Sequence, residues 1–245
     1  MSRSEKMNPS TNHSRYLVCE QKGVYILLMC AAGMMGAYTF NLRGGVFCNA
    51  QTANFVMMAV SFGQRQWLDG CYYLIPIFAY FSGAFFSEIL PSPVKRLKFL
   101  RWDTYLIGFE IFILLIVGLI PLSWPDHLVQ IMINFIASMQ YNTFRQAIGI
   151  PMATTFCTNH LRQTGIALAK LIQKKDRTML RREAAHVEML LSFLMGGILL
   201  TAVCPLMREK AVWLTLIPLS VIFVRMVHAD LTFEHDLLNA KPSGH

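Results

Sequence analysis

Six long apolar runs interrupt this 245-residue chain and limit what it can fold into. Each is close in length to the ~20 residues that an α-helix needs to cross ~30 Å of hydrocarbon. Only 15% of the residues are charged, whereas a soluble domain carries about 25%. We therefore predict an all-α membrane protein with six transmembrane helices. The expected spans are Tyr25–Leu42, Cys71–Leu90, Tyr105–Leu122, Leu128–Ile148, Met189–Leu206 and Val212–Met226.

Basic residues indicate how these spans are oriented. They gather before the first span, in "KRLKFLR" (residues 95–101) after the second, and in "KLIQKKDRTMLRR" (170–182) before the fifth. Placing these stretches inside puts 17 of the 22 lysines and arginines in the cytoplasm and four outside, as the positive-inside rule requires. We expect cytoplasmic tails at residues 1–22 and 229–245 and a single membrane domain at 23–228. The net charge of +8 then orients helices, and no nucleic-acid partner is expected.

Two polar, glycine-containing stretches stand out among the apolar runs: "GGVFCNAQTANFV" (44–56) and "GIPMATTFCTNHL" (149–161). The apolar segments that follow them, Phe55–Phe62 and Gly165–Ile172, are too short to cross a bilayer. With six spans, the first stretch starts and ends outside and the second inside, so each is predicted to be a re-entrant loop with a half-helix. Such non-helical backbone must be buried in protein or face water. In the alternative topology both stretches cross, which gives eight crossings and parallel repeats.

The two halves of the chain also resemble each other. Residues 38–59 and 142–165 both run from Thr-Phe through a Gly-containing linker and a Thr-rich corner into a short helix. Each half, about 25–122 and about 126–228, contains three spans and one half-helix. Because three is odd, the second half is inverted relative to the first. Inverted repeats with broken helices are typical of secondary transporters; chance similarity of two linkers is the alternative.

The same stretches resemble the two signature motifs of the YoaK family of bacterial integral membrane proteins. They are "GMMGAYTFNLRGGVFCNAQTANFVMMAVSFGQ" and "ASMQYNTFRQAIGIPMATTFCTNHLR". The resemblance implies a multi-span fold in the bacterial inner membrane and supplies no established activity. The chain departs from the family pattern at Gly36, which replaces an acid, at Ala53 and Asn159, which replace glycines, and at His160, which replaces Asn. These departures put the specificity or activity of this member in question.

The start of each half-helix is the predicted substrate site. A helix N-terminus offers free N–H groups and a partial positive charge of roughly +0.5, which suits an anion or a polar ligand. We expect Thr52 and Thr158 to be N-caps. The predicted lining residues are Gln51, Thr52, Asn54, Thr158 and His160. The alternatives are that the threonines only cap, that Asn54 only bridges helices, and that His160 is a plain polar residue at the cytoplasmic boundary.

Two charged residues near or within the predicted spans are candidates for coupling or gating. Glu110 lies inside the third span, where a carboxylate must face the bundle, be protonated or have a partner. Arg145, at the end of the fourth span, could pair with Glu110, attract an anion or snorkel to the headgroups. The alternative for Glu110 is a structural hydrogen bond.

Signatures of enzymes and metal sites are absent from the sequence. It has no GxSxG, HExxH or phosphate-binding Gly loop, and its six cysteines lack metal-ligand spacing. We therefore expect no enzymatic activity, no cofactor, no metal and no disulfide. The predicted function is a secondary transporter or permease for a small polar or anionic solute, with membrane lipids around it and a homodimer favoured by its small size. A non-transporting scaffold or partner protein is the alternative.

Overall fold

The structure is a computed structural model that describes residues 16–95, 98–174, 180–238 and 240, without the side chains of residues 174 and 180–183. Residues 1–15 of the predicted N-terminal tail lie outside the described residues. The described chain is almost entirely helical. Its α-helices are α1 (Lys22–Leu42), α2 (Gln51–Gly63), α3 (Trp67–Tyr72), α4 (Leu74–Ile89), α5 (Pro91–Val94), α6 (Trp102–Val117), α7 (Asp126–Thr143), α8 (Thr158–Lys174), α9 (Leu180–Met207) and α10 (Leu216–Leu231). Three 3-10 helices are η1 (Val18–Glu20), η4 (Arg208–Thr215) and η5 (His235–Leu237).

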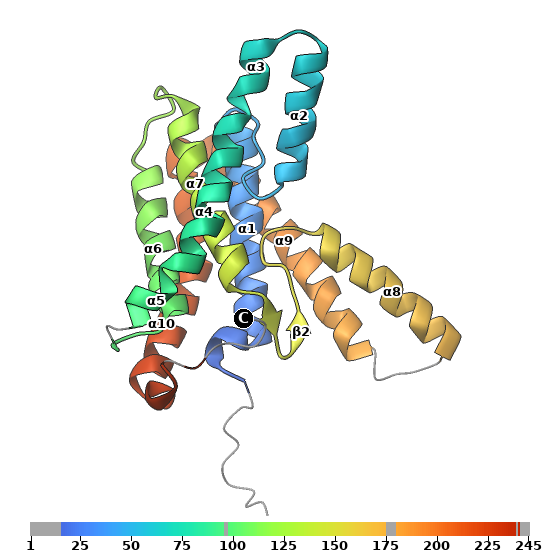
Figure 1. Cartoon of the computed structure of the whole chain (residues 1–245), viewed down its shortest axis with the longest axis vertical. Helices are drawn as coiled ribbons and strands as arrows, with labels where there is room; N and C mark the ends of the chain where they lie inside the picture. The colour runs from blue at the N-terminus through green and yellow to red at the C-terminus, as the bar shows by residue number, and fades with distance from the viewer. Residues whose placement is uncertain (1–15, 96–97, 175–179, 239, 241–245) are drawn as a thin grey trace, which may run out of the picture.

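The long helices form a bundle in which the chain direction alternates (Figure 1). Helices α1, α6 and α9 run upward in this view, and α4, α7 and α10 run downward. The start of α1 and the end of α10 therefore lie at the same end of the molecule. The most extensive helix contacts are those of α1 with α9 and of α4 with α7, while α10 packs on both α1 and α6.

Glycines allow the two main helix pairs to approach closely. A Cβ at Gly196 of α9 would lie 2.1 Å from the Cys30 carbonyl oxygen of α1, and one at Gly83 of α4 would lie 2.3 Å from the Phe135 carbonyl oxygen of α7. No side chain fits at either point. Small residues at such crossings are typical of membrane helices, whose association depends on close packing rather than on the exclusion of water.

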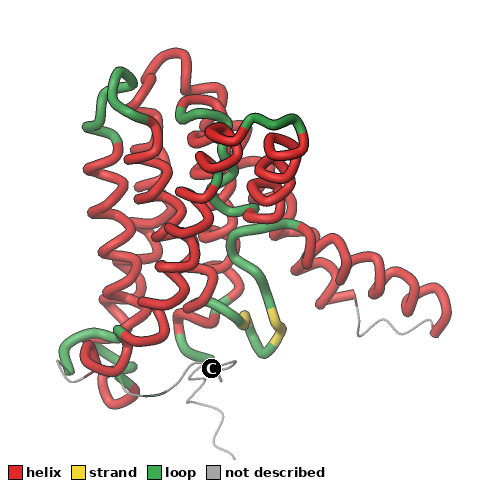
Figure 2. The backbone as a smooth tube through the Cα atoms, turned by 45° about the horizontal axis from the view of Figure 1, so that its top comes forward, coloured by secondary structure: helices red, strands yellow, loops and turns green. Residues whose placement is uncertain are grey.

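Two shorter helices lie beside the bundle. The α2–α3 hairpin leads into α4 at the upper end, and α8 lies beside the first half of α9 at the lower end (Figures 1 and 2). Both α2 and α8 begin near the mid-height of the molecule and run toward opposite ends. They contain the short apolar segments 55–62 and 165–172 and begin before them, at Gln51 and Thr158.

Three predicted spans extend beyond their helices. The third was expected to end at Leu122, whereas α6 ends at Val117, and the fourth and sixth also differ. Helix α7 ends at Thr143 rather than Ile148, and a hairpin of β1 (Gln146–Ala147) and β2 (Ile150–Pro151) follows it. Its turn residues, Ile148 and Gly149, have φ of 50° and 71°, which an α-helix excludes. Similarly, α10 begins at Leu216 rather than Val212, because η4 occupies residues 208–215 after Arg208 takes a φ of 50°.

Among the described residues, three helical segments are long and apolar enough to cross a membrane: Lys22–Leu42, Trp67–Val94 and Ala184–Leu231. The last contains α9, η4 and α10. Helix α6 is apolar but has only 16 residues, and α7 carries several buried polar side chains. The chain is thus a helical, multi-pass membrane protein.

Parts of both predicted tails fold against the bundle. Residues Val18–Glu20 are buried, and the Val18 N–H donates to Glu234 Oε1 at 2.8 Å. Burial raises the pKa of the Glu234 carboxyl. Asp230 Oδ2, at the end of α10, accepts from the Arg101 N–H at 3.0 Å and from the Thr104 hydroxyl at 2.6 Å. The folded unit therefore begins before residue 23 and continues beyond residue 228.

Candidate functional site

The first break lies between α1 and α2. Gly44 and Gly45 have φ of 76° and 69°, so the chain leaves α1 in the left-handed region that glycine favours. Asn49 then donates from Nδ2 to the Ala32 carbonyl of α1 at 3.1 Å. A Cβ at Gly36, the position of the family acid, would lie 3.2 Å from this Asn49 nitrogen. The residue at position 36 therefore faces the first break.

Amide side chains tie the first turn of α2 to α7. Asn54 donates from Nδ2 back to the Phe47 carbonyl at 3.1 Å and to Gln51 Oε1 at 3.0 Å. Gln51 in turn donates from Nε2 to Asn134 Oδ1 of α7 at 2.8 Å. Asn54 is buried and Gln51 is half-buried. These bonds satisfy polar groups of a segment that leaves the helix inside the protein, where unpaired backbone groups are costly.

The second break, between β2 and α8, has an equivalent arrangement. His160 Nε2 lies 2.7 Å from the Ala153 carbonyl oxygen. Ala153 precedes His160 by seven residues, just as Phe47 precedes Asn54 by seven residues at the first break. Gln140 of α7 donates from Nε2 to the Thr154 carbonyl at 3.2 Å. An amide and an imidazole thus make contacts of the same sequence separation at the two breaks.

His160 also joins α8 to α9. Its Nδ1 lies 3.0 Å from Nδ1 of His186, and both rings are buried. Because the Ala153 carbonyl can only accept, Nε2 of His160 carries a proton. In the neutral ring Nδ1 of His160 is then the acceptor, and His186 donates from Nδ1. At this distance only one of the two rings can carry a proton on Nδ1.

Helix α7 therefore touches both breaks. Asn134 contacts the first turn of α2, and Gln140 contacts the loop before α8. Six residues of α-helix separate these two positions, which corresponds to about 9 Å along the axis. Two chain breaks that are about a hundred residues apart in sequence therefore contact one helix at positions fewer than two turns apart.

Several buried polar atoms in and around α7 have no hydrogen-bond partner among the described residues. They are both carboxylate oxygens of Glu110, Oε1 of Gln130, Oε1 of Gln140, and the hydroxyls of Ser138 and Thr154. Leaving a buried polar group unsatisfied costs about 1–3 kcal/mol. A helix with so many such atoms is suited to contact water or a polar solute.

The structure separates the five predicted lining residues into two groups. Asn54, His160 and Gln51 face the protein interior, whereas Thr52 and Thr158 are exposed. The predicted caps are wrong: Ala50 precedes α2 without a side-chain bond, and Thr158 is itself the first residue of α8. Residues 52 and 54 are two apart on a helix and so point in different directions.

The charged candidates also occupy different places. Arg145 pairs with Glu88 at 3.4 Å and donates to Asn142 Oδ1 at 2.6 Å, so a pair with Glu110 is not formed. It lies near the lower end of the bundle, beyond α7. Glu110 is fully buried in α6. Its position inside the bundle agrees with the prediction, whereas a structural hydrogen bond is not found among the described residues.

Sequence reasoning missed the polar face of α7. Gln130, Asn134 and Ser138 recur at a spacing of four, which places them on one side of the helix. This spacing within an apolar run was the signal that could have identified them.

No group of three or more His, Cys, Asp or Glu side chains that could hold a metal is present in the described part of the chain, and all six cysteines are free.

The alternating helices, the apolar spans and the polar breaks held inside the bundle define a multi-pass helical membrane protein. Comparison with known families identifies it further. The chain belongs to the family described as "Protein of unknown function (DUF1275)", the YoaK-like family, whose pattern matches residues 24–225. No curated protein and no solved structure matches it.

Proposed function

We propose that this protein is a secondary transporter or permease for a small polar or anionic solute. It crosses the membrane six times with α1, α4, α6, α7, α9 and α10, and α2 and α8 are re-entrant half-helices. The solute binds near mid-membrane between the first turns of these half-helices, beside the polar face of α7. Glu110 serves in coupling or gating.

Matching contacts in the two halves support the inverted repeat. The first span of each half, α1 or α7, packs on the second span of the other half, α9 or α4. In each pair a glycine of the second span meets a carbonyl of the first span, at Gly196–Cys30 and Gly83–Phe135. Asn54 and His160 each reach the carbonyl seven residues earlier. Such paired relations are expected of two copies of one unit.

The observation that carries the proposal is the meeting of both breaks on α7. Helix N-termini attract polar and anionic groups. Oxygens of Gln130, Ser138 and Gln140 on α7, which have no partner among the described residues, supply further polar groups on the same helix. Irregular backbone within a membrane occurs only where it is buried in protein or faces water, and ionisable residues in spans usually mark functional sites.

The orientation follows from charge. Lys22 begins α1, and Lys95, Lys98 and Arg101 lie between α5 and α6. These segments are at the end of the bundle where α1 starts and α10 ends (Figure 1). The positive-inside rule makes this the cytoplasmic end. Both termini are then cytoplasmic, in the inner membrane of a bacterium.

A solute-dependent stability assay tests the proposal. Purified full-length protein is heated with inorganic phosphate, sulfate, and small carboxylates and amides, and solutes that stabilise it are offered to proteoliposomes. A solute present at about a hundred times its dissociation constant stabilises the folded state by about 2.7 kcal/mol. We expect at least one solute to raise the unfolding temperature and to enter the vesicles.

Substitutions test whether the stabilising solute binds at the first break. Asn54→Ala and Asn134→Ala are expected to abolish the solute-dependent increase, each measured against its own solute-free baseline. Thr52→Ala, which changes an exposed residue of the same turn, is expected to keep it. The absence of any stabilising or transported solute, together with a stoichiometric co-purifying protein, would support the scaffold alternative instead.

A further inference from the structure

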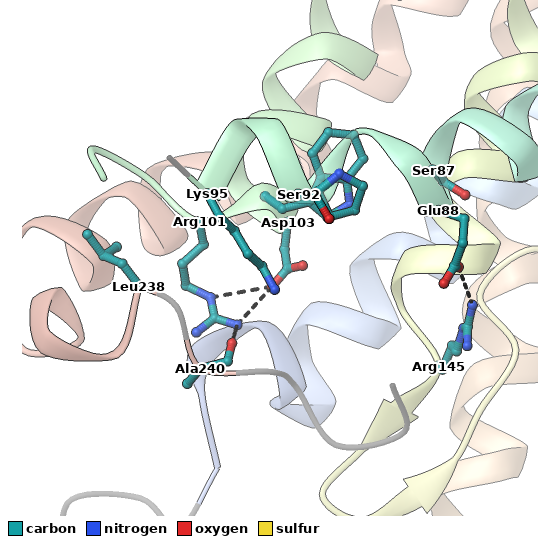
Figure 3. Close-up of a pocket in the computed structure, with 11 residues that line it drawn as sticks. Ser87, Glu88, Ser92, Lys95, Arg101, Asp103, Arg145, Leu238 and Ala240 are labelled. Atoms are coloured by element: carbon teal, nitrogen blue, oxygen red, sulfur yellow. Dashed lines mark hydrogen bonds and ion pairs between the residues drawn. The ribbon is translucent and has the colours of Figure 1, made fainter. Parts of the chain in front are cut away.

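A charged cavity of about 190 Å³ lies at the cytoplasmic end of the proposed topology, apart from the two breaks (Figure 3). It opens where α4 and α5 end and α6 begins. Arg145 and the chain after α10, at Leu238 and Ala240, complete its wall. The side chains of Lys95 and Arg101 lie on one side of it, and those of Glu88 and Arg145 lie on the other.

The cavity has one cation in excess. Arg101 pairs with Asp103 at 3.1 Å and Arg145 pairs with Glu88 at 3.4 Å. Lys95 also lines the cavity, is half-buried, and has no ion pair among the described residues. Two hydroxyl groups, of Ser87 and Ser92, line it as well. One free ammonium with hydroxyl and guanidinium donors around it suits a phosphate ester.

An apolar groove of about 440 Å³ adjoins this cavity. It runs between α4, α6 and α7 on the outside of the bundle. Its lining includes Phe86, Leu90, Val94, Trp102, Tyr105 and Phe109. On α4 and α5, the groove residues 86, 90 and 94 form one stripe and the cavity residues 87, 91 and 95 form the next.

Trp102 is the wall that the cavity and the groove share. Its indole N–H donates to the Thr143 hydroxyl at 3.2 Å, which fixes the ring between them. From Trp102 the groove follows α6 to Phe109, about 10 Å toward the middle of the membrane. Tryptophan at the level of the headgroups is typical of membrane proteins. A polar, cationic cavity thus continues into an apolar groove of the depth that an acyl chain occupies.

We propose that the cavity and groove together bind an anionic phospholipid. Its phosphate lies beside Lys95 and Arg145, and an acyl chain lies against Phe86, Tyr105 and Phe109. An inorganic anion would use only the cavity, and a second copy of the chain would cover only the groove. The lipid alone accounts for both. The proposal does not depend on transport.

Lipid titration of the full-length protein tests this site. Delipidated protein in detergent is titrated with phosphatidylglycerol or phosphatidylcholine of the same acyl chains, and with inorganic phosphate, while bound lipid is counted by native mass spectrometry. An interfacial lysine contributes a factor of about five in affinity for anionic lipid. We expect phosphatidylglycerol to bind about fivefold more tightly than phosphatidylcholine, and phosphate to compete weakly.

Matched variants separate the two parts of the site. Lys95→Gln should remove the preference for phosphatidylglycerol, whereas Lys98→Gln, a nearby exposed lysine outside the cavity, should keep it. Val94→Trp should fill the groove and weaken both lipids, whereas Phe81→Trp, on an exposed part of α4 outside the groove, should not. Three results would overturn the proposal: equal binding of the two lipids by the unaltered protein, equal effects of Lys95→Gln and Lys98→Gln, or a Val94→Trp variant whose only change is its oligomeric state.

Discussion

His160 and Asn54 occupy equivalent positions in the first turns of α8 and α2. Each bonds to the carbonyl seven residues earlier, so either an imidazole or an amide can hold this loop. The ring of His160 makes this bond through Nε2 and also contacts His186 through Nδ1. At this residue, one imidazole therefore holds the loop before α8 and links α8 to α9.

Substitution of His160 tests the two bonds separately. His160→Ala removes both and leaves the Ala153 carbonyl without its imidazole donor, at a cost of about 1–3 kcal/mol. His160→Gln places an amide N–H close to the position of Nε2 and should recover part of that loss. Thermal unfolding in detergent should rank the proteins as unaltered, Gln and then Ala. Thr158→Ala, an exposed neighbour, should unfold with the unaltered protein; equal behaviour of all four would contradict the assignment.

At the scale of helices, the pairs α1–α9 and α4–α7 depend on backbone contact rather than on side-chain interdigitation. Gly196 and Gly197 are adjacent in α9 and differ sharply in this respect. A Cβ at residue 196 would lie 2.1 Å from a backbone oxygen, whereas one at residue 197 would have its nearest atom, the Gly33 oxygen, at 3.6 Å. The first distance is a collision with a group that cannot rotate away, and the second is an ordinary contact.

Gly196→Ala should therefore destabilise the protein and Gly197→Ala should not. Overpacking at a close contact costs about 1–3 kcal/mol, and the loss should appear as a lower unfolding temperature for Gly196→Ala. Gly83→Ala should behave like Gly196→Ala, because the same contact recurs between α4 and α7. If Gly196→Ala and Gly197→Ala unfold together, close approach at residue 196 does not determine the packing of α1 on α9.

For the whole molecule, the proposed topology places the outer end at the α2–α3 hairpin and the inner end where α1 starts and α10 ends. Residue 92 lies in α5 after α4, and residue 173 lies in the last turn of α8, both toward the inner end. Arg43, fully buried at the opposite end, donates to the Ile120 and Pro121 carbonyls after α6 and so closes that end of the bundle.

Cysteine labelling in intact cells tests this topology. Ser92→Cys and Gln173→Cys, each in a Cys71→Ser background, should react with an impermeant maleimide only after the membrane is permeabilised. Native Cys71, exposed in α3, should react from outside and serves as the control. An eight-crossing topology puts residue 92 outside, so external labelling of Ser92→Cys contradicts six spans.

The sequence alone determined the helical membrane class, the family and the existence of two breaks. These conclusions depend on local features of the sequence: the length of an apolar run, the placement of Lys and Arg, and glycine beside polar residues. The same features pointed to Asn54, Gln51 and His160, and equally to Thr52 and Thr158, which the structure leaves exposed. They did not predict the β-hairpin after Thr143, because a run such as residues 128–148 is equally apolar whether its last residues are helical or extended.

Only the tertiary structure decided which polar groups meet. Thr52 and Asn54 look alike in sequence, yet one is exposed and the other buried, since the rotation of α2 is set by its packing on the bundle. The bond of Gln51 to Asn134, the contact of His160 with His186 and the pairing of Arg145 with Glu88 rather than Glu110 join distant parts of the chain. Helix crossings fixed by backbone approach at residues 83 and 196 position these partners, and no local pattern encodes such distances.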